Sequence, residues 1–356
     1  MYDIVILGAG PAGSTLARLL NQSFKTLVLD RRNLDSPEIK GFEKSCGGLL
    51  APDAQEMLAV LGLGLPKEIL VGPQIFTVRT IDLKNNIEQY YQRHYINFNR
   101  EKFDRWLVSL IPDTIEKQFG ISFKSYEVKN NIITLNYIKN GKLHTDQAKY
   151  LVGADGAESL LRRALAPKKN PEKYISIQEW YKCEKAFPYF SAIFDPEITD
   201  FYSWTIPKED RLLLGSAISL NENASLKFQR LKEKLTGNGF DFSTPVKKNG
   251  AFILRPLKTN QIFLGNSPVF LIGEAAGWIS PSSAEGLSYA FISAMNLADS
   301  INSGNDILNT YKKLSRGLKR NILIKNLKSP FMYNSFLRNF VMRLGLNAMK
   351  LYHKGK

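Results

Sequence analysis

The feature that most constrains the fold is a glycine-rich segment between two short apolar runs at the start of the chain. The first run, residues 4–7, is typical of a strand, and Gly8-Ala9-Gly10-Pro11-Ala12-Gly13 follows it directly. Leucines then recur at helical spacing, and a second apolar run over 26–29 ends at Asp30. The order strand, G-x-G-x-x-G, helix, strand and acid predicts a βαβ unit that binds a dinucleotide.

Each polar or small residue of this segment has an expected role. Gly8 permits a tight turn, Gly10 lets the backbone approach a pyrophosphate, and Gly13 lets the helix lie close to the strand. The amide groups at the start of the helix then face the phosphate charge. We expect Asp30 to accept hydrogen bonds from the adenosine ribose hydroxyls.

The bulk composition predicts an intracellular protein with more than one domain. A chain of 356 residues is long for one core and suggests two interlocked domains. The two cysteines, Cys46 and Cys183, imply no disulfide framework and fit a reducing compartment, so we expect a cytoplasmic location. The first strand leaves no room for a signal peptide, and no apolar run reaches the roughly 18 residues that a spanning helix needs.

Metal chemistry and nucleic-acid binding are not expected. The three histidines, His94, His144 and His353, are scattered and predict no zinc site, and no Ser-His-Asp pattern is evident. The net charge is +15, and residues 307–356 contain no Asp or Glu. This basic tail has an amphipathic pattern, so it could lie on the anionic inner face of a membrane or close the protein's own core. It contains no recognised nucleic-acid module.

The remaining motifs follow in order along the chain. A cysteine-glycine loop, Lys44 to Leu49, precedes a predicted helix over 52–61. Residues 75–99 alternate as strands, and a helix is expected after Arg100. Residues 121–150 predict a three-stranded meander in which Val128 closes the first strand, and 174–218 predict an antiparallel sheet. In that sheet Tyr202, Trp204 and Ile206 share one face, which is either core or the aromatic wall of a pocket.

Four separated segments together resemble a family of flavoproteins. They are GAGPAG with Asp30, Arg100 before its helix, GADG at 153–156, and GEAAGWISP at 273–281. The combination is similar to the FAD-dependent group that includes para-hydroxybenzoate hydroxylase, flavin halogenases and geranylgeranyl reductases. The resemblance implies an α/β fold, with a Rossmann-like FAD-binding domain interlocked with an antiparallel-sheet substrate domain and a helical C-terminal extension. The expected ranges are 1–70, 100–165 and 262–303 for the FAD-binding domain, 71–99 and 166–261 for the substrate domain, and 304–356 for the extension.

The resemblance also implies FAD contacts. Asp30 would hold the adenosine ribose, Arg100 would lie near the pyrophosphate, and Val128 would contact the adenine region through its backbone. Glu274 would take the place of the family's usual aspartate on the ribityl chain, with one extra methylene. The implied cofactor-binding residues are Gly8, Gly10, Ala12, Gly13, Asp30, Arg31, Cys46, Gly47, Gly48, Arg100, Val128, Asp155, Gly156, Glu274, Gly277, Pro281, Gly286 and Leu287.

Two features resemble the geranylgeranyl reductases in particular. One is the cysteine-glycine loop, and the other is Tyr202-x-Trp204-x-Ile206-Pro207 followed by Gly215, which is similar to a YxWxFP signature with Ile in place of Phe. The resemblance implies reduction of a carbon–carbon double bond in an apolar, prenyl- or polyene-like substrate by hydride from flavin N5. Cys46, Tyr202 and Trp204 are the catalytic candidates. With one dinucleotide unit evident, NADPH would dock transiently, or an external donor such as a ferredoxin would reduce the flavin.

Two alternatives stay open. A flavin monooxygenase or halogenase would act on an aromatic or carrier-bound compound. Residues 203–207 keep part of the halogenase WxWxIP stretch, although Tyr202 stands where the first tryptophan would be. A non-catalytic FAD-containing redox or binding module at a membrane surface is the other alternative.

Overall fold

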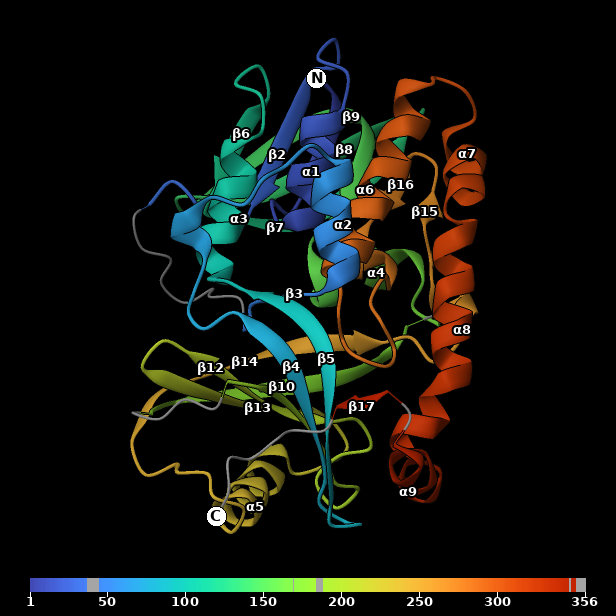
Figure 1. Ribbon diagram of the computed structural model, residues 1–356. Helices are drawn as coiled ribbons and strands as arrows, with labels where there is room; N and C mark the ends of the chain where they lie inside the picture. The colour runs from blue at the N-terminus through green and yellow to red at the C-terminus, as the bar shows by residue number, and fades with distance from the viewer. Residues whose placement is uncertain (37–44, 169, 184–187, 346, 350–356) are drawn as a thin grey trace. The chain divides into compact units, whose positions relative to one another are not determined.

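The computed structural model describes residues 1–36, 45–168, 170–183, 188–345 and 347–349 and divides the chain into two compact units (Figure 1). The first unit comprises Met1–Lys44, Glu101–Glu172 and Leu254–Ile324. The second comprises Ser45–Arg100, Lys173–Ile253 and Lys325–Lys356. Each unit is therefore assembled from three separated segments.

This division differs from the expected domain ranges chiefly in two places, and residues 166–172 and 254–261, expected in the substrate domain, also group with the first unit. Residues 45–70 group with the second unit, because β3 (Leu49–Leu50) pairs with β5 (Ile87–Asn97). The tail is not a separate region, since the boundary between the units falls within α8 (Arg316–Tyr333). Local sequence patterns do not indicate such pairing between distant segments.

The first unit contains the predicted βαβ segment inside a parallel sheet. Along the order β15-β16-β9-β1-β2-β6, neighbouring strands pair in parallel except β15 and β16, and two further strands extend the sheet from β9 in antiparallel pairing. Residues 4–7 are buried, as expected for a parallel strand that is covered on both faces. The strands are β1 (Tyr2–Leu7), β2 (Thr26–Asp30), β6 (Glu116–Phe119), β9 (Lys142–Gly153), β15 (Gly265–Asn266) and β16 (Val269–Leu271).

The predicted meander over 121–150 is confirmed. It consists of β7 (Ile121–Lys129), β8 (Ile132–Lys139) and β9. Asn130-Asn131 and Asn140-Gly141 have positive φ angles, which the two-residue turns between twisted antiparallel strands require.

Helices cover the sheet of the first unit. α1 packs beside α6 (Figure 1), and Asn302 at the end of α6 donates to the oxygen of Leu19 at 2.9 Å. The helices are α1 (Pro11–Leu19), α3 (Arg100–Ser109), α4 (Leu160–Leu165), α6 (Leu287–Asn302) and α7 (Ile307–Leu314), and the short 3-10 turns are η2 (Gly156–Glu158), η3 (Thr259–Gln261) and η4 (Gly273–Ala276).

The second unit is built on a larger sheet with the order β14-β10-β13-β12-β11-β4-β5-β17. The antiparallel pairing expected for 174–218 is confirmed, whereas β4 and β11 pair in parallel. The parallel pair joins strands from distant segments, so no local turn signalled it. The further strands are β4 (Ile75–Asp82), β10 (Glu172–Lys182), β11 (Phe190–Phe194), β12 (Ser203–Lys208), β13 (Arg211–Ser219), β14 (Pro245–Arg255) and β17 (Ala348–Met349).

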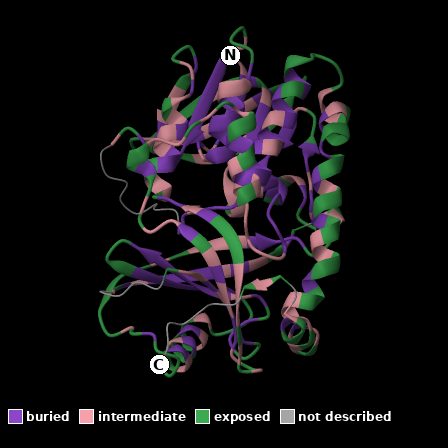
Figure 2. Cartoon of the chain, viewed as in Figure 1, coloured by how far each residue is buried: buried purple, intermediate pink, exposed green. Residues whose placement is uncertain are grey.

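The helices of the second unit include the predicted one after the cysteine-glycine loop, α2 (Pro52–Val60). Helix α5 (Ala224–Thr236) buries Phe228, Leu231 and Leu235 in a core with residues of β10 and β13. η1 (Lys67–Ile69) is a single turn, and α9 (Ser335–Leu344) follows α8. Figure 2 shows many buried residues along the strands, whereas α8 and α9 carry many exposed ones.

Candidate functional site

The glycine loop after β1 has two packed glycines and one that faces open space. Gly8 has φ +106°, and a Cβ atom there would lie 2.4 Å from the oxygen of Ala154. A Cβ atom at Gly13 would lie 1.8 Å from the oxygen of Gly8. A Cβ atom at Gly10 would lie 4.0 Å from its nearest neighbour, the Nη2 of Arg32. The backbone beside Gly10 is therefore open to a ligand, while Gly8 and Gly13 are needed for packing.

Asp30 lies directly under this loop, but its carboxylate is already engaged. The amide of Ala9 donates to Oδ2 at 2.7 Å, and Arg32 donates from Nε and Nη2 at 3.1 and 3.0 Å. Arg32 also donates to Asp104 at 2.6 Å, and these carboxylates raise its pKa despite burial. A ribose hydroxyl would share the Asp30 carboxylate with Arg32. Arg32 was not among the residues predicted from the sequence, where its position two residues after Asp30 was the signal.

Asp155 lies against the same loop, since a Cβ atom at Gly8 would lie 3.0 Å from its amide nitrogen, and Gly156 follows it with φ +77°. β9 ends beside Leu7, and the amide of Ala154 donates to the oxygen of Leu7 at 2.7 Å. Asp155 Oδ2 accepts from the amide of Leu160 at 3.1 Å, whereas its buried Oδ1 has no hydrogen-bond partner in the described part of the chain. Burial raises the pKa of Asp155 to about 6, although Arg31 acts in the opposite direction. An orphaned buried oxygen is a place where a ligand donor or a proton fits.

Glu274 begins a segment that two arginines hold in shape. Glu274 Oε1 accepts from the amide of Leu254 at 3.0 Å. Arg162 donates to the oxygen of Ala275 at 3.1 Å, and Arg255 donates to the oxygen of Pro281 at 3.1 Å. Gly277, with φ +88°, ends the η4 turn. The backbone of this segment is thus fixed by buried guanidinium groups.

The segment leads into the start of α6. Gly286 is the N-cap and Leu287 the first helical residue, and the cap residue makes no side-chain hydrogen bond. The amide groups at a helix start and the helix dipole favour a negative charge or a carbonyl oxygen. Ala12 belongs to the same surroundings, since a Cβ atom at Gly273 would lie 2.9 Å from its Cβ.

Val128 lies elsewhere in the first unit. Val128 pairs with Ile133, Ile133 pairs with Ala148, and Ala148 pairs with Tyr2 at the start of β1. Val128 therefore lies at the amino end of β1. Ligands of parallel sheets bind at the carboxyl ends of the strands, where Gly8 lies. We therefore leave Val128, which is 43% exposed, out of the cofactor site. The chain beside Asp30 is instead the end of β6, where the amide of Gly120 donates to the oxygen of Arg32.

In the second unit, Cys46 lies between two N–H donors. The amide of Gly48 is 3.4 Å from its sulfur, and Nη1 of Arg100 is 3.5 Å from it. Both donors orient the sulfur and would stabilise negative charge on it. The resemblance implied that Arg100 lies near the pyrophosphate. In the structure its Nη1 contacts the thiol of Cys46, which belongs to the same unit.

Lys208 supports the same loop from beneath. Its ammonium group donates to the oxygens of Gly48 at 2.9 Å and Phe98 at 3.1 Å and to the side chain of Asn97. Burial lowers the pKa of Lys208 to about 7, while the charge of Cys46 acts to raise it. Lys208 was not among the residues predicted from the sequence, although a lysine directly after the aromatic signature was a signal.

The aromatic strand packs directly on the cysteine-glycine loop. A Cβ atom at Gly47 would lie 2.6 Å from Cδ1 of Ile206, and one at Gly215 would lie 2.3 Å from the indole of Trp204. Trp204 is buried, and Tyr202 is half-buried with its ring centroid 5.4 Å from that of Trp204. The structure thus brings Cys46, Gly47, Gly48 and the aromatic signature together in one cluster.

Comparisons with known proteins decide the family. No protein-family model matches the chain. Protein CbrA of Escherichia coli O6:H1 is 39% identical over 346 residues, which cover 97% of this chain and 94% of the relative. Protein CbrA of Shigella sonnei is also 39% identical, covering 97% of each chain. The chain belongs to the CbrA family.

Solved structures give the fold of the CbrA family member described here. A geranylgeranyl bacteriochlorophyll reductase-like protein from Thermoplasma acidophilum has a TM-score of 0.74 at 20% identity, covering 98% of this chain and 88% of that one. PqsL, a probable FAD-dependent monooxygenase from Pseudomonas aeruginosa, has a TM-score of 0.70 at 15% identity, covering 96% and 99%. A variant of the halogenase PltM in complex with FAD has a TM-score of 0.70 at 16% identity, covering 97% and 79%. The expected resemblance to reductase, monooxygenase and halogenase flavoproteins is confirmed as a likeness of fold.

Proposed function

We propose that this protein is an FAD-dependent oxidoreductase that reduces a carbon–carbon double bond of an apolar, prenyl- or polyene-like substrate. The observation that carries the proposal is the packing of the cysteine-glycine loop on the aromatic strand. A Cβ atom at Gly47 would lie 2.6 Å from Cδ1 of Ile206, and one at Gly215 would lie 2.3 Å from the indole of Trp204, so both glycines pack closely on the aromatic strand. Two motifs that are far apart in the sequence and that resemble the geranylgeranyl reductases thus form one cluster.

The first unit offers groups that fit FAD. The open backbone at Gly10 and the orphaned oxygen of Asp155 are two unfilled interactions of the kind a dinucleotide supplies, and the start of α6 adds a helix dipole. We assign the pyrophosphate to the amides at the start of α1 with Arg32 nearby, the ribityl chain to Glu274, and the ring carbonyl to the amides that follow Gly286. When bound, FAD supplies the hydride of the reaction at N5.

The second unit offers a proton carrier. A hydride adds to one alkene carbon and a proton to the other, so the reaction needs an acid at the second carbon. Cys46 is our candidate, because two N–H donors hold its sulfur and would stabilise it after the proton leaves. Trp204 is packed too tightly to react, and we assign it to shaping the apolar wall with Tyr202. The electrons come from NADPH or another external reductant.

A monooxygenase or halogenase is the second candidate. The likeness of fold to PqsL and to PltM supports it about as well as the likeness to the reductase-like protein supports the first. The tyrosine at position 202, where the halogenase stretch would have tryptophan, favours the reductase over the halogenase.

Product analysis with and without O2 separates these candidates. The FAD-supplemented protein would be reduced with dithionite and given geranylgeranyl diphosphate or, separately, an aromatic acid. We expect a mass gain of two hydrogens for each reduced bond, unchanged when O2 is excluded. A product that forms only with O2 would support the second candidate. Tight flavin binding with no product under any condition would favour a non-catalytic role.

A further inference from the structure

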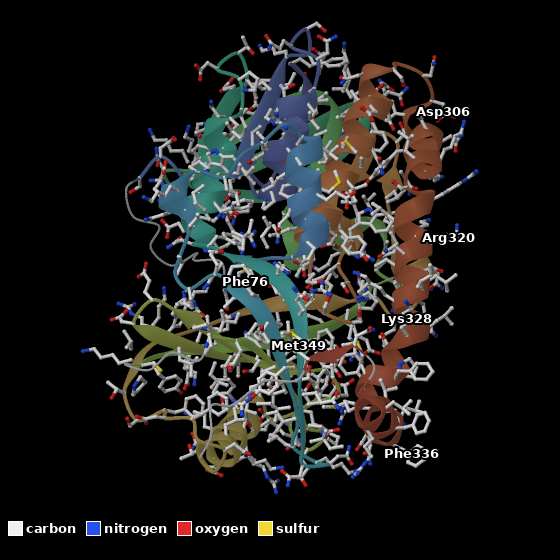
Figure 3. The ribbon with its side chains drawn as sticks, in the orientation of Figure 1. Phe76, Asp306, Arg320, Lys328, Phe336 and Met349 are labelled. Atoms are coloured by element: carbon white, nitrogen blue, oxygen red, sulfur yellow. The ribbon has the colours of Figure 1, made fainter. Side chains whose placement is uncertain are left out.

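Helix α9 turns its apolar side to solvent. Phe336, Phe340 and Leu344 recur every fourth residue and are 79%, 62% and 54% exposed. Arg338 and Met342, on the other side of the helix, are 4% and 3% exposed. Figure 3 shows Phe336 on the outer side of α9. This is the reverse of an ordinary surface helix, which buries its apolar stripe.

Buried polar contacts hold the helix in this orientation. Arg338 donates from Nε to Asp82 at 2.7 Å, and the Asp82 side chain has no exposed surface. Asn85 donates to the oxygen of Ser335 at 3.1 Å. Rotating the apolar stripe inward would break a buried ion pair, which is costly because it leaves a charge unpaired.

The helix is also anchored at its far end. β17, which follows α9, pairs with Tyr90 and Tyr91 of β5. The side chain of Gln89, in the same strand, donates to the oxygen of Met342. Contacts at both ends and in the middle thus keep the three apolar side chains outward.

The last turns of α8 extend the pattern. Leu327 and Phe331 are 67% and 51% exposed, whereas Ser329 between them is buried. Two exposed basic residues, Arg343 and Lys328 (labelled in Figure 3), accompany the apolar residues. We call the exposed set the apolar stripe: Leu327, Phe331, Phe336, Phe340 and Leu344.

We propose that the apolar stripe docks the protein on an anionic membrane surface. Large apolar side chains interspersed with lysine and arginine are the composition of a helix that lies in a bilayer interface. No Asp or Glu occurs in residues 307–356, so the charged side chains of α8 and α9 themselves are all basic and complement anionic lipid headgroups. A second copy of the chain would bring the same positive charge to the contact and be repelled. No helix in the described ranges has both the length and the apolar character to span a bilayer.

Sedimentation with liposomes tests this docking on the full chain. The wild-type protein is expected to bind vesicles of phosphatidylcholine mixed with phosphatidylglycerol at least about tenfold better than phosphatidylcholine alone, and less well at high salt. The double variant Phe336→Ser and Phe340→Ser should bind at least about tenfold more weakly. The variant Phe76→Ser is the matched control, because Phe76 is 60% exposed in β4 and lies outside the stripe. Changing Lys328 and Arg343 to glutamate should remove the preference for anionic vesicles.

The same experiments can overturn the proposal. Equal vesicle binding by the wild type and the Phe336 and Phe340 double variant would do so. A double variant that loses an oligomer in light scattering would instead make the stripe a protein interface. A large drop in its melting temperature would place the stripe in the protein's own core. The inference does not rest on the proposed function, because vesicle binding needs neither FAD nor turnover.

Discussion

The ammonium group of Lys208 donates to the main-chain oxygen of Gly48 at 2.9 Å. The same nitrogen bonds to Phe98 and Asn97, so one buried side chain joins the end of β12 to the cysteine-glycine loop and to the end of β5. Lys208 is therefore a positioning residue for the loop that carries Cys46.

Replacing Lys208 should destabilise the second unit. Lys208→Met leaves buried oxygens without donors, so we expect the free energy of unfolding to fall by about 2–3 kcal/mol, measured by urea denaturation. Lys182→Met changes an exposed lysine of β10 and should stay within about 0.5 kcal/mol of the wild type. Equal stability of the two variants would remove Lys208 from this role.

Valine substitutions at Gly10 and Gly13 should affect FAD binding and folding in different ways. At Gly10 a valine meets open space and has an ordinary φ of −76°, so Gly10→Val should fold normally and bind FAD at least about 100-fold more weakly. At Gly13 the added Cβ would lie 1.8 Å from a backbone oxygen, so Gly13→Val should lower the melting temperature of the apoprotein. Thermal unfolding and FAD titration of both variants check this. Full FAD affinity in Gly10→Val would contradict the assignment of the loop to the pyrophosphate.

Asp155 predicts a pH dependence of apoprotein stability. Burial raises its pKa from 3.8 in the unfolded chain to about 6, so the folded protein binds the proton more tightly. Its contribution to stability is full below about pH 4 and is lost as the pH rises through about 6. Asp155→Asn removes that loss, so its gain in melting temperature over the wild type should be larger at pH 7.5 than at pH 4.5. A gain that is the same at both pH values would show that Asp155 does not titrate in this range.

The two cysteines provide a matched pair for the catalytic assignment. Cys46→Ala should retain FAD but slow alkene reduction by at least about tenfold, because the positioned proton carrier is lost. Cys183→Ala removes the other free cysteine and should leave turnover unchanged. Steady-state rates at matched flavin content make the comparison. Unchanged turnover in Cys46→Ala would remove this residue from the mechanism.

Local chemistry explains what the sequence predicted well. The βαβ segment and the turns at Asn130-Asn131 and Asn140-Gly141 depend on glycine or asparagine at backbone positions that few residues tolerate, so their positions can be inferred from residue type. The antiparallel block over 174–218 follows from alternation and short connections. In each case neighbours in sequence are neighbours in space.

Contacts between distant segments explain what was missed. Arg32 and Lys208 acquire their roles from Asp104, Asn97 and the backbone of Gly48, and no spacing in the sequence indicates these pairs. The resemblance implied an adenine contact for Val128, but the strand register decides which end of the sheet Val128 occupies. Helical periodicity likewise showed that α9 is amphipathic but not that its apolar side faces outward, which depends on the ion pair between Arg338 and Asp82.

The most direct test of the central claim is the reoxidation of the reduced flavoprotein. The FAD-supplemented protein would be reduced anaerobically with dithionite, and its flavin absorbance followed as air is admitted. The proposed reductase predicts slow reoxidation, over minutes, with the oxidised spectrum returning in a single phase. Fast reoxidation through a transient absorbing species would contradict it and favour an oxygenase or halogenase. The absence of any flavin spectrum would contradict the assignment of FAD itself.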